Sequence, residues 1–235
     1  MIRAQAGTVI DPDVVVRGAD RVRQRIVDAG GDPARIGIVA VTKGFDASAL
    51  EAAATTGLTM IGENYAQELS AKLDQLHPEV RDRLDVHFIG RLQSNKIRQL
   101  AGLVDLWQSV DRMRLVREIA RHTPGAAILV QLDVSGASTQ GGCGLDDAPD
   151  LIEQARDMGL EVRGCMAIGP QASPGEIETA FAEVVRFADR HDLEHRCIGM
   201  SADLEHAVRA GSTMVRLGTA LFGERPPRIT SSRGD

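Results

Sequence analysis

The chain has 235 residues, of which 43% are hydrophobic and 26% charged, a composition typical of a globular protein that can form one barrel-sized α/β domain. Its formal net charge of −6 and aromatic content of 3% argue against a nucleic-acid or anionic-membrane surface, because such surfaces need clustered basic residues or stacking aromatics. The 3 cysteines are widely spaced and no apolar run is long enough to span a membrane, so we expect a cytoplasmic protein with reduced thiols.

Amphipathic and apolar segments alternate along the chain and predict helices and strands in regular succession. The first segment, residues 11–29, predicts a helix with Val15, Ala19, Val22 and Ile26 on one stripe. Short apolar runs then predict eight buried strands separated by helices. The predicted strands cover residues 36–41, 58–61, 85–89, 104–108, 127–134, 161–166, 196–198 and 213–217, and the predicted helices cover 46–55, 63–75, 94–100, 111–122, 148–158, 174–189, 202–210 and 219–222.

Eight β/α alternations without a long linker predict a single (β/α)8 TIM barrel rather than a doubly wound sheet. The expected organisation is an N-terminal extension over residues 1–11, the barrel with its extra N-terminal helix over 12–223, and a disordered tail over 224–235. The carboxyl ends of all eight strands would then meet at one face, where barrels of this type bind their ligands.

Lys43 directly follows the first predicted strand and would lie at that face. An ammonium group held against apolar surroundings loses hydration, which lowers its pKa and allows the neutral amine to attack a carbonyl. The alternative is a lysine whose stem covers the strand end while its charge stays in water. Taken alone, this stretch favours the alternative.

Glycine and hydroxyl residues follow the seventh and eighth predicted strands, in the segments Gly199-Met200-Ser201 and Gly218-Thr219. In barrels, the loops at these two places often bind phosphate through backbone N–H groups and hydroxyls. Ordinary turns and helix caps are the alternative, but two such turns after neighbouring strands favour phosphate. Because the eighth strand neighbours the first, one small molecule could be held there by both Lys43, through an aldehyde, and the glycine-containing turns, through a phosphate. Pyridoxal 5′-phosphate (PLP) carries both groups.

Six segments occur along the chain in the order AVTKGF, IGENYAQEL, HFIGRLQSNK, SVDR, RGCMAIGP and GMSADLEHAVRAGSTMVRLGTALFG. They resemble the successive signatures of the YggS/PROSC-type pyridoxal phosphate homeostasis proteins over residues 12–223. The resemblance implies a barrel of the alanine racemase N-terminal type, which is fold type III among PLP proteins, with PLP held as a Schiff base on Lys43. It also implies phosphate contacts from Ser201, Gly218 and Thr219, with Met200 beside them and Arg216 near the pyridine nitrogen.

Asn64 and His87 complete the residues that we expect to bind the cofactor. Asn64 follows the second predicted strand and could reach the polar edge of the ligand. His87 could lie beside or behind the ring, although a lone histidine in an apolar strand is more often a hydrogen-bonded core residue. The polar loop 91–96 would gate the ligand, bind a partner or simply be solvated. Glu63, beside Asn64, is equally well explained as a carboxylate in the first turn of the following helix.

Arg216 indicates how much chemistry would follow binding. Arginine stays protonated, so opposite the ring nitrogen it would donate a hydrogen bond and keep that nitrogen unprotonated, which makes the ring a poorer electron sink. An arginine paired with an acid on the barrel rim is the alternative. The chain also departs from the family, because Cys197-Ile198 stands where Ser-Met is usual and loop 135–144 lacks a lysine that some members carry.

The favoured function is a non-catalytic protein that holds PLP and acts in intracellular PLP (vitamin B6) homeostasis and amino-acid balance. We expect a monomer or weak dimer, with apo forms of PLP-dependent enzymes as recipients and no metal site. The alternative is a PLP-dependent racemase or related fold type III enzyme, for which Lys43 would be catalytic. Racemases of this fold need a tyrosine base and a second domain, whereas the only tyrosine here, Tyr65, adjoins Asn64. A barrel enzyme acting on another phosphorylated metabolite, with Lys43 as a charge clamp or Schiff-base catalyst, is a third hypothesis.

Overall fold

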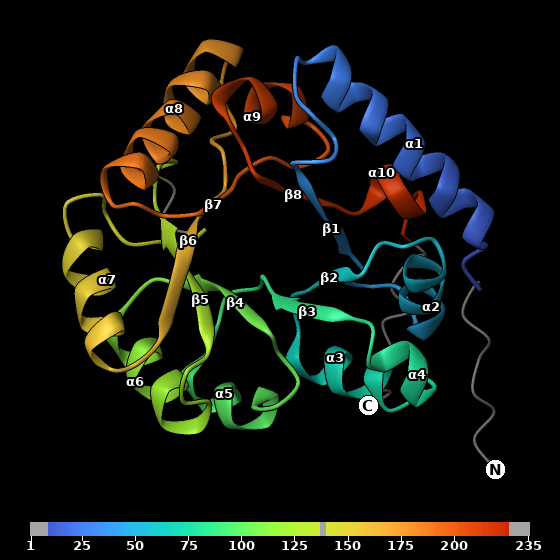
Figure 1. Cartoon of the computed structure of the whole chain (residues 1–235), viewed down its shortest axis with the longest axis horizontal. Coiled ribbons are helices and arrows are strands. Elements are labelled where there is room, and N and C mark those ends of the chain that lie inside the picture. Colours follow the sequence, from blue (N-terminus) through green and yellow to red (C-terminus); the bar gives the residue numbers. More distant parts are fainter. Residues whose placement is uncertain (1–8, 137–139, 226–235) are drawn as a thin grey trace, which may run out of the picture.

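A closed barrel of eight parallel strands forms the centre of the molecule (Figure 1). The computed structural model describes residues 9–136 and 140–225, so residues 226–235 of the predicted tail and residues 1–8 of the predicted extension lie outside the described part. Each strand pairs with its neighbour in the chain, and β8 pairs with β1 to close the ring, which confirms the predicted (β/α)8 barrel. The strands are β1 (Gly37–Val41), β2 (Met60–Glu63), β3 (Asp85–Phe88), β4 (Leu106–Val110), β5 (Ala127–Leu132), β6 (Glu161–Ala167), β7 (His195–Cys197) and β8 (Met214–Leu217).

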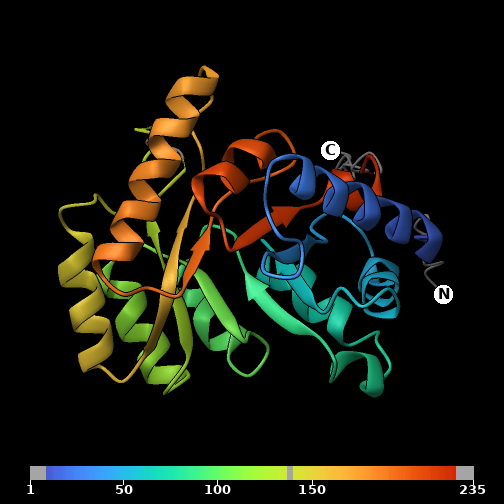
Figure 2. The same ribbon diagram turned by 45° about the horizontal axis from the view of Figure 1, so that its top comes forward.

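Helices surround the barrel on its outer side (Figures 1 and 2). None of the helices in the described part of the chain is long and apolar enough to cross a membrane. They are α1 (Pro12–Asp28), α2 (Ala47–Thr55), α3 (Ala66–Leu73), α4 (Pro78–Arg81), α5 (Ser94–Leu100), α6 (Met113–His122), α7 (Ala148–Asp157), α8 (Pro174–Arg190), α9 (Leu204–Ala210) and α10 (Thr219–Phe222).

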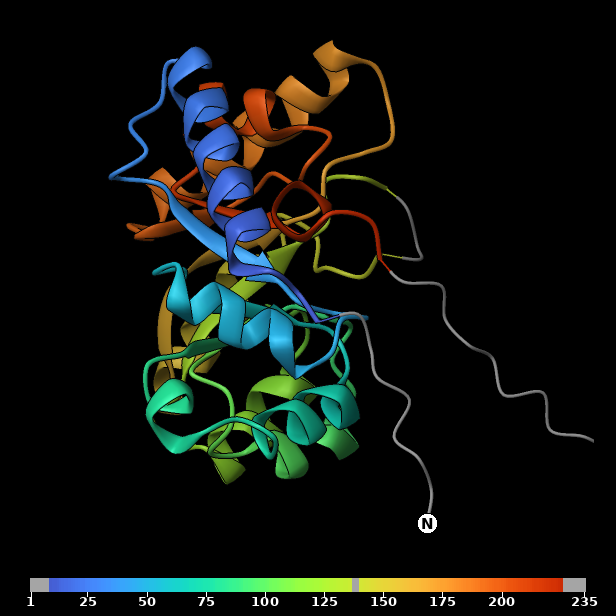
Figure 3. The ribbon, with the colours of Figure 1, turned by 90° about the vertical axis from the view of Figure 1, so that its right-hand side faces the viewer.

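The N-terminal helix α1 packs against α10, next to the strands that close the barrel (Figure 3). Its predicted apolar stripe is buried, and Asp11 caps its first turn by accepting a hydrogen bond from the backbone N–H of Asp13. A Cβ atom at Gly18 would lie 2.7 Å from the carbonyl oxygen of Leu221, so only glycine lets the two helices approach this closely. Helix α1 therefore supports the C-terminal elements of the barrel.

The main difference from the predicted elements concerns β2 and α3. Strand β2 ends at Glu63, and α3 begins at Ala66, so Glu63 is a strand residue and its interpretation as a first-turn helix carboxylate is wrong. Its side chain is fully buried, which is possible because the Nζ atom of Lys72 lies 2.6 Å from its Oε1 atom. The short helix α4 was not predicted, because four residues are too few to show helical periodicity.

The interior of the barrel is packed by a small apolar cluster that is separate from the larger core between strands and helices. Polar side chains share this interior, since buried Gln108 contacts Cys197 and Met214 of the inner cluster and also His87. The inner cluster comprises Val39, Leu106, Ala127, Leu129, Met166, Cys197 and Met214.

Candidate functional site

A cavity of about 290 Å³ lies at the carboxyl end of the barrel. This volume is at the lower end of the range of about 300–1,000 Å³ that is usual for ligand pockets, so it suits a small ligand. Its lining residues come from the ends of β1, β6 and β8 and from the segments that follow β1, β2, β3, β6, β7 and β8. They are Val41, Lys43, Asn64, Ile89, Met166, Ile168, Met200, Ser201, Ala202, Arg216, Gly218, Thr219 and Arg225. The structure therefore brings together all the residues predicted to bind the cofactor except His87.

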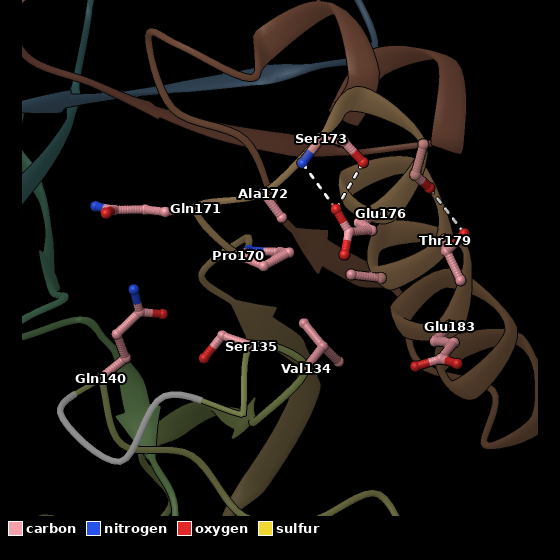
Figure 4. A pocket seen from close by; sticks show the side chains of 12 residues that line it. Val134, Ser135, Gln140, Pro170, Gln171, Ala172, Ser173, Glu176, Thr179 and Glu183 are labelled. Atoms are coloured by element: carbon pink, nitrogen blue, oxygen red, sulfur yellow. Dashed lines mark hydrogen bonds between the residues drawn. The ribbon is translucent and has the colours of Figure 1, made fainter.

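A second, larger cavity of about 820 Å³ lies between the segments that follow β5 and β6 and the start of α8 (Figure 4). Its described lining contains no lysine, arginine or histidine, whereas Glu176 and Glu183 contribute carboxylates. Glu176 accepts hydrogen bonds from the backbone N–H of Ser173 at 2.9 Å and from its hydroxyl at 2.6 Å, so it serves as a helix cap. This cavity does not suit a phosphate, and the smaller cavity remains the candidate site.

Lys43 is partly buried in the wall of the smaller cavity, two residues after the end of β1. Burial lowers the pKa of its ammonium group, and the positive charges of Arg225 and Arg216 lower it further, while the carboxylate of Glu63 opposes them. More of the side chain is therefore neutral near neutral pH than in a solvated lysine. A neutral amine is the form that attacks a carbonyl carbon.

The backbone on both sides of Lys43 is held by buried polar groups. The Nζ atom of Lys72 donates to the carbonyl oxygen of Thr42 at 2.8 Å and to Oε1 of Glu63 at 2.6 Å. The hydroxyl of Thr42 donates to the same Glu63 oxygen at 2.6 Å, and the peptide N–H after Lys43 donates to Oε2 of Glu68 at 3.1 Å. These bonds join β1, β2 and α3 and fix the place from which the lysine side chain extends.

Ser201, Gly218 and Thr219 line the same cavity as Lys43. Gly218 and Thr219 form the N-terminal end of α10, where backbone N–H groups have no partner within the helix and favour an anion. A Cβ atom at Gly218 would lie 3.3 Å from the carbonyl oxygen of Val41, which explains a glycine at this close approach to β1. Arg25 of α1 holds the other loop by donating from Nη2 to the carbonyl oxygen of Ser201 at 3.0 Å.

Arg216 is 6% exposed and lines the cavity. Its Nη1 atom donates to the carbonyl oxygen of Cys197 at 2.6 Å and to the Cys197 sulfur at 3.1 Å, and Nη2 donates to the carbonyl oxygen of Ala167 at 2.8 Å. No carboxylate among the described residues pairs with it, so the structure does not have the alternative arrangement, an arginine paired with an acid on the barrel rim. A guanidinium carries five N–H groups, and the Nε hydrogen and one Nη2 hydrogen therefore remain for a ligand.

His87, which was expected to contact the ligand, is not among the residues that line the cavity. It is 1% exposed in β3, with Nδ1 at 2.7 Å from Nε2 of Gln108 and Nε2 at 3.2 Å from Oδ2 of Asp85. The alternative interpretation of a hydrogen-bonded core residue describes it correctly.

Two features of the site were not anticipated from the sequence. Arg225 lines the cavity although it falls in the segment expected to be a disordered tail, and its Nη2 atom lies 3.8 Å from the Cβ position of Gly218. Its only sequence signal is its place six residues after Thr219. Met166 both packs in the inner cluster and lines the cavity. Asn64 lines the cavity as expected, and its Oδ1 atom is buried without a partner among the described residues.

Comparisons with known proteins place this geometry in context. The profile of the alanine racemase N-terminal domain family matches residues 20–226. The pyridoxal phosphate homeostasis protein of Pseudomonas aeruginosa is 38% identical over 220 residues, which cover 90% of this chain and 94% of that protein. The structure of PipY from Synechococcus elongatus with PLP bound is 29% identical with a TM-score of 0.72, covering 86% of this chain and 100% of PipY. Lysine decarboxylase from Selenomonas ruminantium shares the fold alone, at 18% identity and a TM-score of 0.65, covering 93% of this chain and 63% of that chain.

Proposed function

Because the chain belongs to the alanine racemase N-terminal domain family and to the pyridoxal phosphate homeostasis proteins, we propose that it binds PLP in the 290 Å³ cavity and acts in PLP homeostasis. The observation that carries this proposal is the combination in one cavity of a lysine with a lowered pKa, the N-terminal end of α10 and a buried arginine. These three groups match the aldehyde, the phosphate and the ring nitrogen of PLP.

Each group has a defined task in holding the cofactor. The neutral amine of Lys43 would hold the cofactor through its aldehyde, with loss of water, in a bond that hydrolysis can reverse. Ser201, Gly218 and Thr219 donate hydrogen bonds to the phosphate, and Arg225 adds positive charge beside them. Arg216 directs its remaining N–H groups at the ring nitrogen, and Asn64 offers its buried oxygen to a donor on the ring.

We propose carrying rather than catalysis. PLP supplies an electron sink for carbanion chemistry, and an arginine opposite the ring nitrogen weakens that sink. Tyr65 is not among the residues that line the cavity, and it borders instead a neighbouring depression of about 410 Å³. A two-base racemisation therefore has no second base in the cavity among the described residues. A bond that hydrolysis reverses suits a protein that releases PLP to apo forms of PLP-dependent enzymes, and these recipients and a monomer or weak dimer remain predictions.

The proposal is tested by adding PLP to the purified protein, reducing the mixture with borohydride and mapping the modified peptide by mass spectrometry. We expect a new absorption band on binding, and a reduced adduct of PLP on Lys43 alone. A protein that takes up no PLP, or one modified only at Lys96, the partly exposed lysine of the neighbouring depression, would rule out the proposed site. Robust turnover in racemisation assays across the common amino acids would instead favour the enzyme.

The rate of PLP uptake is expected to rise with pH and to reach half its maximum below about pH 10.4, the pKa of an ordinary lysine. Only neutral Lys43 attacks the aldehyde, and burial with two nearby arginines lowers the pKa at which that form appears. Stopped-flow absorbance at a series of pH values measures this midpoint. The variant Arg225→Gln removes one of the positive charges, so its midpoint should lie at higher pH than that of the wild type, and a midpoint shifted the other way would contradict the assignment.

A further inference from the structure

Polar side chains inside the barrel form a continuous chain of contacts from Arg216 in β8 to Asp85, the first residue of β3. The Nη1 atom of Arg216 lies 3.1 Å from the Cys197 sulfur, and that sulfur lies 3.1 Å from Oε1 of Gln108. The Nε2 atom of Gln108 lies 2.7 Å from Nδ1 of His87, whose Nε2 atom lies 3.2 Å from Oδ2 of Asp85. These residues come from β3, β4, β7 and β8, which face one another across the barrel in Figure 1.

The direction of hydrogen bonding in this chain is fixed from its Asp85 end. Asp85 accepts from His87, and this hydrogen bond is the largest cause that lowers the pKa of the Asp85 carboxyl. With one hydrogen on the imidazole, placed at Nε2 where it faces the carboxylate, Nδ1 is the acceptor for the amide of Gln108. The sulfur of Met214 lies 3.3 Å from the same amide nitrogen, so both acceptors lie on that side of Gln108.

The orientation of Gln108 in turn determines how Cys197 meets Arg216. Because the amide nitrogen of Gln108 faces His87 and Met214, its oxygen faces Cys197 and accepts the thiol hydrogen. The sulfur lone pairs are then free to accept from Arg216. If the oxygen and nitrogen of the Gln108 amide exchanged places, the thiol of Cys197 would face an N–H group and would have no acceptor in Gln108. The thiol hydrogen would then crowd the N–H groups that Arg216 directs at the sulfur. The thiol of Cys197 is fully buried, and burial raises its pKa, so it stays a protonated donor in this chain.

We propose, on the basis of the PLP-binding function above, that His87, Gln108 and Cys197 are positioning residues that hold Arg216 with its free N–H groups directed at the ring nitrogen of the cofactor. The Cys197 sulfur occupies the second hydrogen of Nη1, so that atom has none left for a ligand. The free donors are then confined to Nε and Nη2. His87 thus acts on the cofactor through Arg216, without touching it.

Two variants of Cys197 test the proposal with little change in volume. Cys197→Ala removes the thiol from the chain, and we expect PLP affinity to fall about tenfold, the usual effect of one lost buried hydrogen bond. The absorption maximum of bound PLP should shift as well, because the contact with the ring nitrogen changes. Cys197→Ser keeps a donor and an acceptor and should restore both properties. If Cys197 served packing alone, the serine variant should bind PLP more weakly than the alanine variant, because serine must bury a hydroxyl and alanine need not.

A second pair of variants tests the far end of the chain. His87→Asn keeps an acceptor near the Nδ1 position and should bind PLP with the affinity and absorption maximum of the wild type. His87→Leu removes that acceptor and should behave like Cys197→Ala. Thermal melts identify any variant that fails to fold. If a His87 variant does not fold, the two Cys197 variants decide the question by themselves. If the wild type and all folded variants bind PLP with the same affinity and spectrum, the positioning role is wrong and the PLP site stands. If the wild type binds no PLP, both are wrong.

Discussion

Replacing Lys72 by methionine is expected to lower the free energy of unfolding by about 3–5 kcal/mol, the usual cost of removing one partner of a buried ion pair. The Lys72 side chain is 6% exposed and the Glu63 side chain 0%, and their charged atoms lie 2.6 Å apart. Without the ammonium group, the Glu63 carboxylate would keep only the hydroxyl of Thr42 as a donor, since its Oε2 atom has no hydrogen-bond partner among the described residues. Urea unfolding monitored by circular dichroism measures the loss.

The double variant Glu63→Leu with Lys72→Met is the matched control. Removing both charges leaves no unpaired carboxylate, so most of the lost stability should return. Lys96→Met, at a lysine with no ion pair among the described residues, should change stability by no more than about 0.5 kcal/mol. A loss below about 1 kcal/mol in Lys72→Met, or no recovery in the double variant, would contradict the buried pair.

The barrel could be predicted from the sequence because its determinants are local. The strands appear as apolar runs of about three to eight residues separated by amphipathic segments, and the spacing of apolar residues along the chain is enough to recognise them. The positions of Lys43, Ser201 and Gly218 follow from the same pattern, since each lies in the segment that follows a strand, and all these segments meet at one face of a barrel. No knowledge of long-range contacts is required for these residues.

The parts of the site that escaped prediction depend on distant partners. Glu63 reads as a surface carboxylate until the ammonium group of Lys72, nine positions later, is placed against it. Arg225 lines the cavity beside Gly218, and nothing in the local sequence after α10 indicates this contact. The depth of His87 depends on its partner Gln108, which lies 21 positions away in the neighbouring strand. The periodicity of apolar residues shows which face of a helix or strand is buried. Which polar side chains pair with one another inside the barrel depends on the tertiary structure.

Lys43→Ala is expected to abolish the covalent attachment of PLP and to raise its dissociation constant by about a hundredfold or more, equivalent to about 3 kcal/mol. The phosphate loops and Arg216 remain in the variant, so weak binding without a reducible bond should persist. Borohydride should then attach no PLP to the residues that line the cavity. The PLP concentration that saturates the wild type should also raise the melting temperature of the variant less, because stabilisation by a ligand depends on its concentration relative to the dissociation constant.

Loss of binding in Lys43→Ala can be separated from loss of folding by the stability of the ligand-free protein. The pKa of Lys43 is lowered in the folded state by burial and by the charges of Arg225 and Arg216, so folding disfavours its charged form. Removing this lysine should therefore leave the ligand-free protein at least as stable as the wild type, as is common when a functional residue is lost. Lys96→Ala removes an amine from the neighbouring depression and should retain full PLP binding. If Lys43→Ala keeps the reducible adduct, or if Lys96→Ala loses it, Lys43 is not the residue that holds the cofactor.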